Sequence, residues 1–249
     1  LSATYYQSWL FEIVVMVIMF LGTLNFMLYA RVRSGNVRTF FENIEVRTLA
    51  GWCAVLMAAF AAVVFAAEYI PEFDTVLRRG VFTVVSAVTG TGFSLFADNQ
   101  IQTIFSSGAF FVVILAMATG GCTNSTAGGI KALRVGIVVK SGIASIQRIL
   151  LPENAQVTAA YHDEGGRHVL TREESNGAMV VFSLYCASMV IGALVAIVYG
   201  YDAISAIFES VSTTANVGLS TGIVSATAPS VLKVVYIIQM LLGRLEFLP

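Results

Sequence analysis

The chain has 249 residues, of which 57% are hydrophobic and only 12% are charged. A water-soluble domain carries roughly a quarter of charged residues, so this composition excludes an ordinary soluble protein and indicates a protein embedded in membrane lipid. The formal net charge of −1 gives no reason to expect a nucleic-acid partner.

The first half of the chain contains two apolar runs of membrane-spanning length, residues 11–30 and 48–67. A hydrocarbon core of ~30 Å needs about 20 helical residues, so each run predicts a span. Residues 75–88 are also apolar but too few to cross. They predict a re-entrant helix, which enters the membrane and returns as extended chain that protein must bury or water must line.

The next apolar region is interrupted in its middle. Residues 104–119 and 130–149 have helical patterns, but the ten residues between them are small or polar and include four glycines. Each glycine costs a helix roughly 1 kcal/mol relative to alanine. We therefore expect a broken helix whose intramembrane loop is formed by Gly120, Gly121, Cys122, Thr123, Asn124, Ser125, Thr126, Ala127, Gly128 and Gly129.

The last part repeats the same order of elements. A polar segment, residues 151–176, is expected in water, and residues 177–199 form another span. Residues 202–214 are a second short apolar helix, and residues 231–248 begin a last span. Ten of the fourteen basic residues lie in loops on one side of this topology, which predicts that side to be cytoplasmic.

Each non-spanning helix is followed by a short glycine motif, and the second motif lies 126 residues after the first and nearly repeats it. The helices before the motifs match at the same offset, with Phe82, Val85 and Ser86 reappearing as Phe208, Val211 and Ser212. A dehydrated cation needs a ring of oxygen ligands, which backbone carbonyls supply at regular spacing. Glycine lets a carbonyl adopt angles that a side chain would forbid. We expect a cation to bind at backbone carbonyls of Thr89, Gly90, Thr91, Gly92 and Phe93, and of Ala215, Asn216, Val217, Gly218 and Leu219.

These motifs resemble those of the Trk/Ktr/HKT superfamily of potassium transporters, and most of all the C-terminal half of the bacterial Trk-type membrane subunit. The filters carry Gly92-Phe93-Ser94 and Gly218-Leu219-Ser220, and the loop that ends in Gly128-Gly129-Ile130-Lys131 resembles the family's intramembrane gating loop. The sequence Gly243-Arg244-Leu245-Glu246-Phe247 resembles the family's last-helix motif.

The resemblance implies a larger assembly. It implies four such repeats around one pore, of which this chain carries two, so we expect the chain to be part of a longer protein. It further implies a homodimer of that full-length protein, a cytosolic nucleotide-binding regulatory subunit, and the bacterial cytoplasmic (inner) membrane as location. The permeant ion would be K⁺, and we expect no cofactor in this chain and no enzymatic activity.

The predicted fold class is an all-α polytopic membrane protein with repeated span–pore helix–filter–span units around a central ion pore. We divide the chain into residues 1–47, the last span of a preceding repeat with a cytoplasmic loop; 48–150, a pore repeat with a broken second span; 151–176, a cytoplasmic loop; and 177–249, a second pore repeat whose last span is truncated. The predicted function is gated permeation of a monovalent cation, with K⁺ uptake as the expected case. The alternative is an ion-coupled secondary transporter with broken helices.

Arg244 is a charge in an apolar segment, where it faces either a cavity or the membrane surface. In the register of the repeat, position 244 corresponds to Ala118, just before the loop. We therefore expect its guanidinium in the pore at the level of the loop, where it would donate to loop carbonyls and repel K⁺. The alternative for the loop itself is a glycine-rich surface for helix packing.

Overall fold

The computed structural model describes residues 8–66, 73–96, 105–150, 159–163 and 166–245. These ranges fold into helices and a two-stranded antiparallel hairpin. The helices are α1 (Trp9–Thr23), α2 (Phe26–Arg33), α3 (Val37–Glu42), α4 (Ile44–Ala66), α5 (Phe73–Val88), α7 (Ser107–Ala118), α8 (Ala132–Leu150), α9 (Arg172–Val198), α10 (Ala203–Thr214) and α11 (Ser230–Arg244). The strands are β1 (Ala160–Asp163) and β2 (Gly166–Val169).

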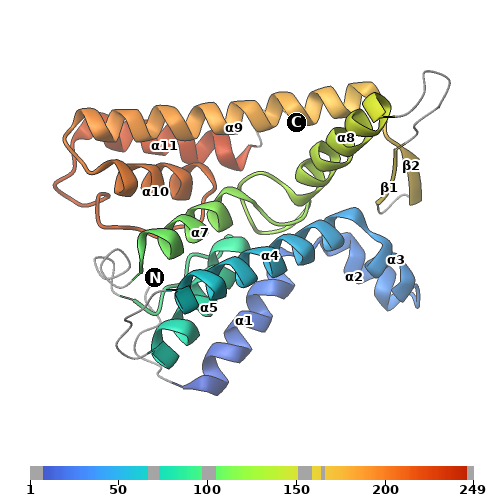
Figure 1. The fold of residues 1–249 in the computed structure, drawn as a ribbon, viewed down its shortest axis with the longest axis horizontal. Helices are drawn as coiled ribbons and strands as arrows, with labels where there is room; N and C mark the ends of the chain where they lie inside the picture. Colours follow the sequence, from blue (N-terminus) through green and yellow to red (C-terminus); the bar gives the residue numbers. More distant parts are fainter. Residues whose placement is uncertain (1–7, 67–72, 97–104, 151–158, 164–165, 246–249) are drawn as a thin grey trace.

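Two groups of helices flank a central broken helix (Figure 1). Helices α9, α10 and α11 pack together on one side, and α1, α4 and α5 lie on the other. Helix α7 contacts both short helices, α5 and α10, while α8 contacts both long helices, α4 and α9. The broken helix formed by α7 and α8 therefore contacts both groups of helices.

Two of the described helices, α4 and α9, are long and apolar enough to cross a membrane, and the pair α1 and α2 would be a third span if counted together. Many of their large apolar side chains are exposed, among them Val55 and Phe65 on α4 and Val190, Ile191 and Leu194 on α9. Apolar faces on this scale belong in contact with lipid or with another protein surface. The predicted all-α polytopic membrane fold is confirmed.

The first apolar run is broken, contrary to the prediction of one span over residues 11–30. Helix α1 ends at Thr23, α2 begins at Phe26, and the two axes meet at 95°. Asn25 is the cause that the sequence offers, because its side-chain oxygen accepts a hydrogen bond from the backbone N–H of Met27 at 2.8 Å and caps α2. Its polar side chain inside the run was the available signal.

The core lies around α7 and the two short helices. Phe110 of α7 stacks on Phe208 of α10, with ring centroids 4.7 Å apart, and Phe60 of α4 contacts Phe105 edge-on. Val217 and Leu219, which belong to the second predicted filter, are buried in the same cluster. The second predicted filter is thus part of this hydrophobic core, whose close packing restricts its movement.

The other predicted helices agree with the structure to within a few residues. Both short apolar segments are helical, as α5 and α10, and Asp202 caps α10 by accepting from two of its first backbone N–H groups. Helix α11 ends at Arg244, and the expected continuation of the last span to residue 248 falls on residues 246–249, outside the described residues.

The polar segment between the repeats contains a hairpin that the sequence pattern did not predict. Strand β1 pairs with β2 in the register Ala160↔Val169, and the hydroxyl of Tyr161 donates to Glu174 at 3.1 Å. Burial and this hydrogen bond raise the pKa of Tyr161 to about 12. Among the described residues, no group of three His, Cys, Asp or Glu side chains is arranged to hold a metal ion.

Candidate ion filter and intramembrane loop

The two predicted filters continue their pore helices with the same backbone hydrogen bonds. In the first repeat, the N–H groups of Thr89, Gly90 and Thr91 donate to the carbonyls of residues 85, 87 and 86. In the second, Ala215, Asn216 and Val217 donate to residues 211, 213 and 212, each 126 positions later. Corresponding distances agree within 0.1 Å, at 2.9, 3.1 and 3.0 Å against 2.9, 3.2 and 2.9 Å. The sequence repeat is therefore also a repeat of backbone conformation.

Left-handed backbone recurs at matching positions of the two filters. Gly90 and Gly92 have φ of 66° and 76°, and their counterparts Asn216 and Gly218 have φ of 55° and 95°. Glycine adopts this region at no steric cost, and asparagine is among the few other residues that tolerate it. Every second residue is thus left-handed, a geometry that can present neighbouring polar backbone groups on one side of the chain.

The two filters lie against each other. A Cβ atom added to Gly92 would overlap the carbonyl oxygen of Val217 and would lie 3.2 Å from the Cα of Gly218. Gly243 of α11 is equally restricted, because its Cβ would overlap the carbonyl oxygen of Thr214. The filters and the last helix leave no room for side chains at these glycines.

Glu209 is a functional candidate that the sequence interpretation missed. It lies in α10 with 1% of its surface exposed, and its Oε1 accepts from the hydroxyl of Ser220 at 2.5 Å and from the N–H of Thr221 at 2.7 Å. Both donors follow the second filter directly. The matching residue of the first repeat is Thr83, whose hydroxyl donates to Arg79 in its own helix. The segment that follows the second filter is therefore held by a buried carboxylate, whereas the matching position of the first repeat is a threonine.

The loop of residues 120–129 is non-helical, as predicted, and packs directly against both predicted filters. A Cβ on Gly90 would lie 3.2 Å from the Cβ of Ala127. A Cβ on Gly128 would lie 2.5 Å from the carbonyl oxygen of Ala215 and 2.9 Å from the Cβ of Asn216. Glycines in the loop permit this close approach, since any side chain there would displace the filter backbone.

The ends of the loop are bonded to each other and its body is bonded to α1. The N–H of Gly120 donates to the carbonyl of Ile130 at 2.8 Å, which closes the base. The N–H of Cys122 donates to the carbonyl of Thr23, and the hydroxyl of Thr126 donates to the carbonyl of Gly22 at 2.9 Å. The last carbonyls of a helix lack partners within the helix. The break after Thr23 therefore supplies the acceptors that hold the loop.

Two buried charged side chains also bind the loop, and neither was predicted. Glu45 of α4, 2% exposed, accepts from the N–H of Thr123 at 2.7 Å, and Asn25 donates to both Glu45 and the Thr123 hydroxyl. Lys131 donates to the carbonyl of Ala127 at 2.7 Å. Buried charges persist only where hydrogen bonds and charges compensate them, so these residues fix the loop where it stands.

Arg244 contacts the loop as the register of the repeat predicts. Its Nη1 donates to the carbonyl oxygen of Thr126 at 2.8 Å, and Arg244 is the last residue of α11. The N–H and the hydroxyl of Thr126 both donate to the carbonyl of Gly22 in α1. Thr126 thus links α1, the loop and α11, while the effect of Arg244 on ions stays a prediction.

A buried ion pair fixes the first pore helix. Glu12 of α1, 4% exposed, accepts from both Nε and Nη2 of Arg78 in α5, each at 2.6 Å. The guanidinium of Arg78 also lies 4.4 Å from the centroid of the Trp9 ring. A bidentate pair of this kind sets the orientation as well as the distance between two helices, so α1 positions the helix that carries the first filter.

Two repeated glycine segments that follow short helices and pack against the loop of a broken helix are the arrangement predicted for a membrane protein of the cation-transport class. Comparison with known proteins agrees: the TrkH family profile, described as cation transport protein, matches residues 2–249. The chain belongs to this family, within the Trk/Ktr/HKT superfamily that the sequence motifs resemble.

Several proteins are similar over nearly the whole chain. An uncharacterized cation transporter of Methanocaldococcus jannaschii is 31% identical over 92% of the chain and 44% of its own length. The Trk system potassium uptake protein TrkH of Salmonella typhimurium is 27% identical over 98% of the chain and 50% of its own length. The crystal structure of the potassium transporter TrkH from Vibrio parahaemolyticus has the same fold, with a TM-score of 0.79 and 24% identity, over 98% of this chain and 52% of that one. The chain therefore spans about half the length of these relatives.

Proposed function

We propose that this chain provides two of the four filter segments, and the gating loop, of a K⁺ uptake pore. The observation that carries the proposal is the equivalence of the two filters, which share three backbone hydrogen bonds and the positions of their left-handed residues. Equivalent segments in contact with each other suit symmetric coordination of an ion. The name of the Salmonella relative, a potassium uptake protein, supports K⁺ as the substrate.

The filter would select ions through its backbone. Carbonyl oxygens replace part of the hydration shell of the ion. Because the surrounding protein fixes their positions, they favour an ion of one size over others. Helices α5 and α10 end at the filters, so their C-terminal partial negative charges also favour a cation there. The chemistry needs no reactive side chain, in keeping with relatives that are named as transporters.

The loop would close the pore below the filter. Its residues 127 and 128 pack against Gly90 and Ala215, and the guanidinium of Arg244 donates to the carbonyl of Thr126 in the loop. A guanidinium at this level would repel K⁺, and the loop itself would block its path. Opening then requires that the loop leave its present hydrogen bonds.

Assembly and control follow the family resemblance. We propose that the full-length protein is a homodimer in the bacterial cytoplasmic membrane and that a cytosolic nucleotide-binding subunit controls the loop. Helix α8 begins at Ala132, three residues after the loop, and extends to Leu150 beside the hairpin. It offers a direct mechanical connection between a cytosolic partner and the loop.

The test is ion flux through the full-length protein in liposomes. A K⁺ gradient should drive uptake of ⁸⁶Rb⁺ as a K⁺ tracer, and Na⁺ should compete weakly. Uptake that depends strictly on a co-transported H⁺ or Na⁺ would favour the ion-coupled carrier instead. Absence of any monovalent cation flux from folded protein, with and without the regulatory subunit, would refute the proposal.

A further inference from the structure

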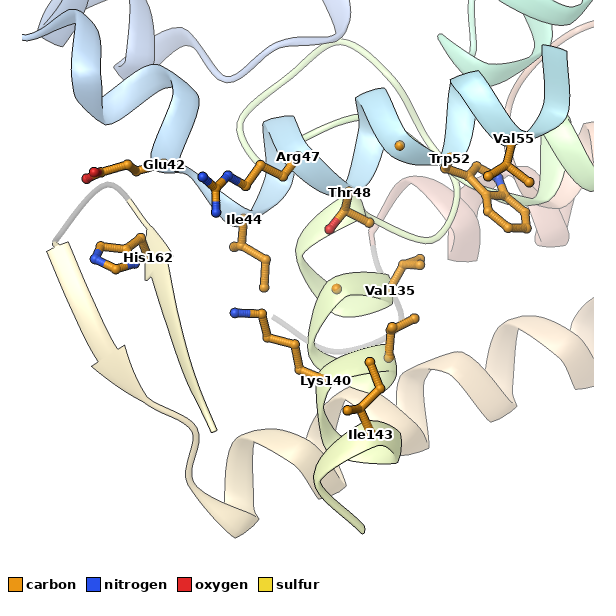
Figure 2. A pocket seen from close by; sticks show the side chains of 13 residues that line it. Glu42, Ile44, Arg47, Thr48, Trp52, Val55, Val135, Lys140, Ile143 and His162 are labelled. Carbon is orange, nitrogen blue, oxygen red and sulfur yellow. The ribbon is translucent and has the colours of Figure 1, made fainter. Parts of the chain in front are cut away.

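A cavity of about 440 Å³ lies between α4 and α8 and is bounded at one end by strand β1 (Figure 2). Its volume is within the range of small-molecule sites. Most of its wall is apolar, with Val55 and Gly51 on α4 facing Val139 and Ile143 on α8. The cavity plays no part in the filter or in the loop contacts.

The end of the cavity at strand β1 is basic. Arg47, Lys140 and His162 line it, and Figure 2 shows the Arg47 and Lys140 side chains extending toward the same end as His162. Glu42 also lines this end, but it is paired with Arg38 at 2.6 Å, which offsets its charge. The cavity is thus amphipathic along its length, with cationic groups gathered at the end next to the hairpin.

The two long cations are held in place with donors to spare. Nε of Arg47 donates to the carbonyl of Phe41 at 2.8 Å, and Nζ of Lys140 donates to that of Ala160 at 2.6 Å. A guanidinium has five N–H donors and an ammonium has three. One bond each fixes the side chains and leaves further donors for an anionic ligand.

We propose that this cavity binds an anionic glycerophospholipid, with an acyl chain between α4 and α8 and the phosphate at Arg47 and Lys140. A soluble anion would not use the apolar walls, and a neutral lipid would not use the cations. Basic residues at the cytoplasmic surface of a membrane protein attract anionic headgroups. The apolar wall and the basic end together match one class of molecule, a membrane lipid with net negative charge.

Trp52 gives a direct readout, because it lines the cavity on the α4 side away from Lys140 (Figure 2). The experiment uses full-length protein in which every other tryptophan, Trp9 included, is changed to Phe. The protein is placed in phosphatidylcholine vesicles with a small fixed fraction of phosphatidylglycerol or phosphatidylcholine brominated on its acyl chains. Bromine quenches Trp52 fluorescence only in contact, so quenching measures occupancy of the cavity.

We expect brominated phosphatidylglycerol to associate about fivefold more strongly than brominated phosphatidylcholine at Trp52. The double variant Arg47→Gln, Lys140→Gln should lose this preference, whereas the control Arg33→Gln, Arg148→Gln should keep it. Gly51→Leu should reduce quenching by both lipids, because a Cβ there points into open space within the cavity. Gly142→Leu is its matched control, since a Cβ on Gly142 also meets nothing and Gly142 does not line the cavity.

Three results would overturn the proposal. Equal quenching by the two lipids would remove the anionic specificity, and a preference retained by the Arg47 and Lys140 double variant would move the headgroup elsewhere. Quenching by neither lipid would mean that protein, rather than lipid, fills the cavity in the full-length molecule. The Gly51→Leu comparison alters no charged residue, so it tests whether an acyl chain occupies the cavity even if the double variant does not fold. Quenching that is equal in Gly51→Leu and Gly142→Leu would contradict that occupancy.

Discussion

The Nη1 atom of Arg244 lies 2.8 Å from the carbonyl oxygen of Thr126, although 118 residues separate the two in the chain. Thr126 is also bonded to Gly22 through both its N–H and its hydroxyl. One loop residue is therefore held between the end of α1 and the end of α11. If the loop is the gate, these bonds are part of what keeps it closed.

Removal of the Arg244 side chain should open the pore more often. We expect Arg244→Ala to raise K⁺ flux and to weaken its dependence on the regulatory subunit, because it removes a positive charge and the bond to Thr126. Arg244→Lys should lie between, since lysine keeps the charge but not the planar fork of donors. Deletion of Thr123 to Ala127 should have the same direction with a larger effect. The measurement is ⁸⁶Rb⁺ uptake into proteoliposomes.

Lys233 supplies the control for this prediction. It lies on the same helix and donates to the carbonyl of Ala226, remote in sequence from the loop. Lys233→Ala should therefore leave the flux and its regulation unchanged. Lower flux from folded, membrane-inserted Arg244→Ala and loop-deletion proteins would contradict the gate.

The buried carboxylate of Glu209 should matter for both selectivity and stability. Glu209→Ala leaves the half-buried Ser220 hydroxyl and Thr221 N–H without their acceptor, at a cost of up to about 1–3 kcal/mol for each donor. We expect a lower melting temperature and a reduced K⁺/Na⁺ flux ratio, with a smaller effect for Glu209→Gln, whose amide oxygen can still accept. Thr83→Ala at the matching position should leave the K⁺/Na⁺ flux ratio unchanged, because the Thr83 hydroxyl donates to the carbonyl of Arg79 in its own helix. Equal selectivity in Glu209→Ala and wild type would show that the rim needs no such anchor.

The Glu12–Arg78 pair should be strongly coupled. Removing Arg78 leaves the buried Glu12 carboxylate without its guanidinium, so Arg78→Gln alone should destabilise the fold by about 3–5 kcal/mol. Glu12→Gln should cost less, because the Arg78 side chain is only half-buried. The double variant should lose much less than the sum of the two, which a double-mutant cycle of unfolding in detergent would measure. Additive effects would mean that the two side chains act independently and that α1 does not position α5.

Much of this architecture is predictable from the sequence because it depends on length, apolarity and repetition. The two short helices, the non-helical loop and the 126-residue repeat follow from such local patterns. The contact between Arg244 and the loop followed from the register of the repeat alone. The division of the chain into pore repeats, and the functional roles of the filter, loop and Arg244, stay predictions.

What escaped the sequence depends on partners that are distant in the chain. Glu12 binds Arg78 across 66 residues and Glu45 binds Thr123 across 78, so no local pattern connects them. For Glu12 and Arg78 the signal was present as charges inside apolar runs, which need a partner. Glu45 lies outside the predicted runs and gave no such signal. The bend at Asn25 was missed because the apolar run continues on both sides of it. The only local signal was the single polar side chain that caps the start of α2.

The central claim is that the glycines of the two filters form a selective backbone site, and the K⁺/Na⁺ flux ratio of the full-length protein in liposomes tests it most directly. Gly92→Ser places a Cβ against the carbonyl oxygen of Val217, and Gly218→Ser strains a backbone with φ of 95°. Strain of about 1–3 kcal/mol at each site should lower the ratio by about tenfold. Gly142→Ser, in open space and regular helix, should leave it unchanged. A ratio equal to wild type in both folded filter variants would contradict the account.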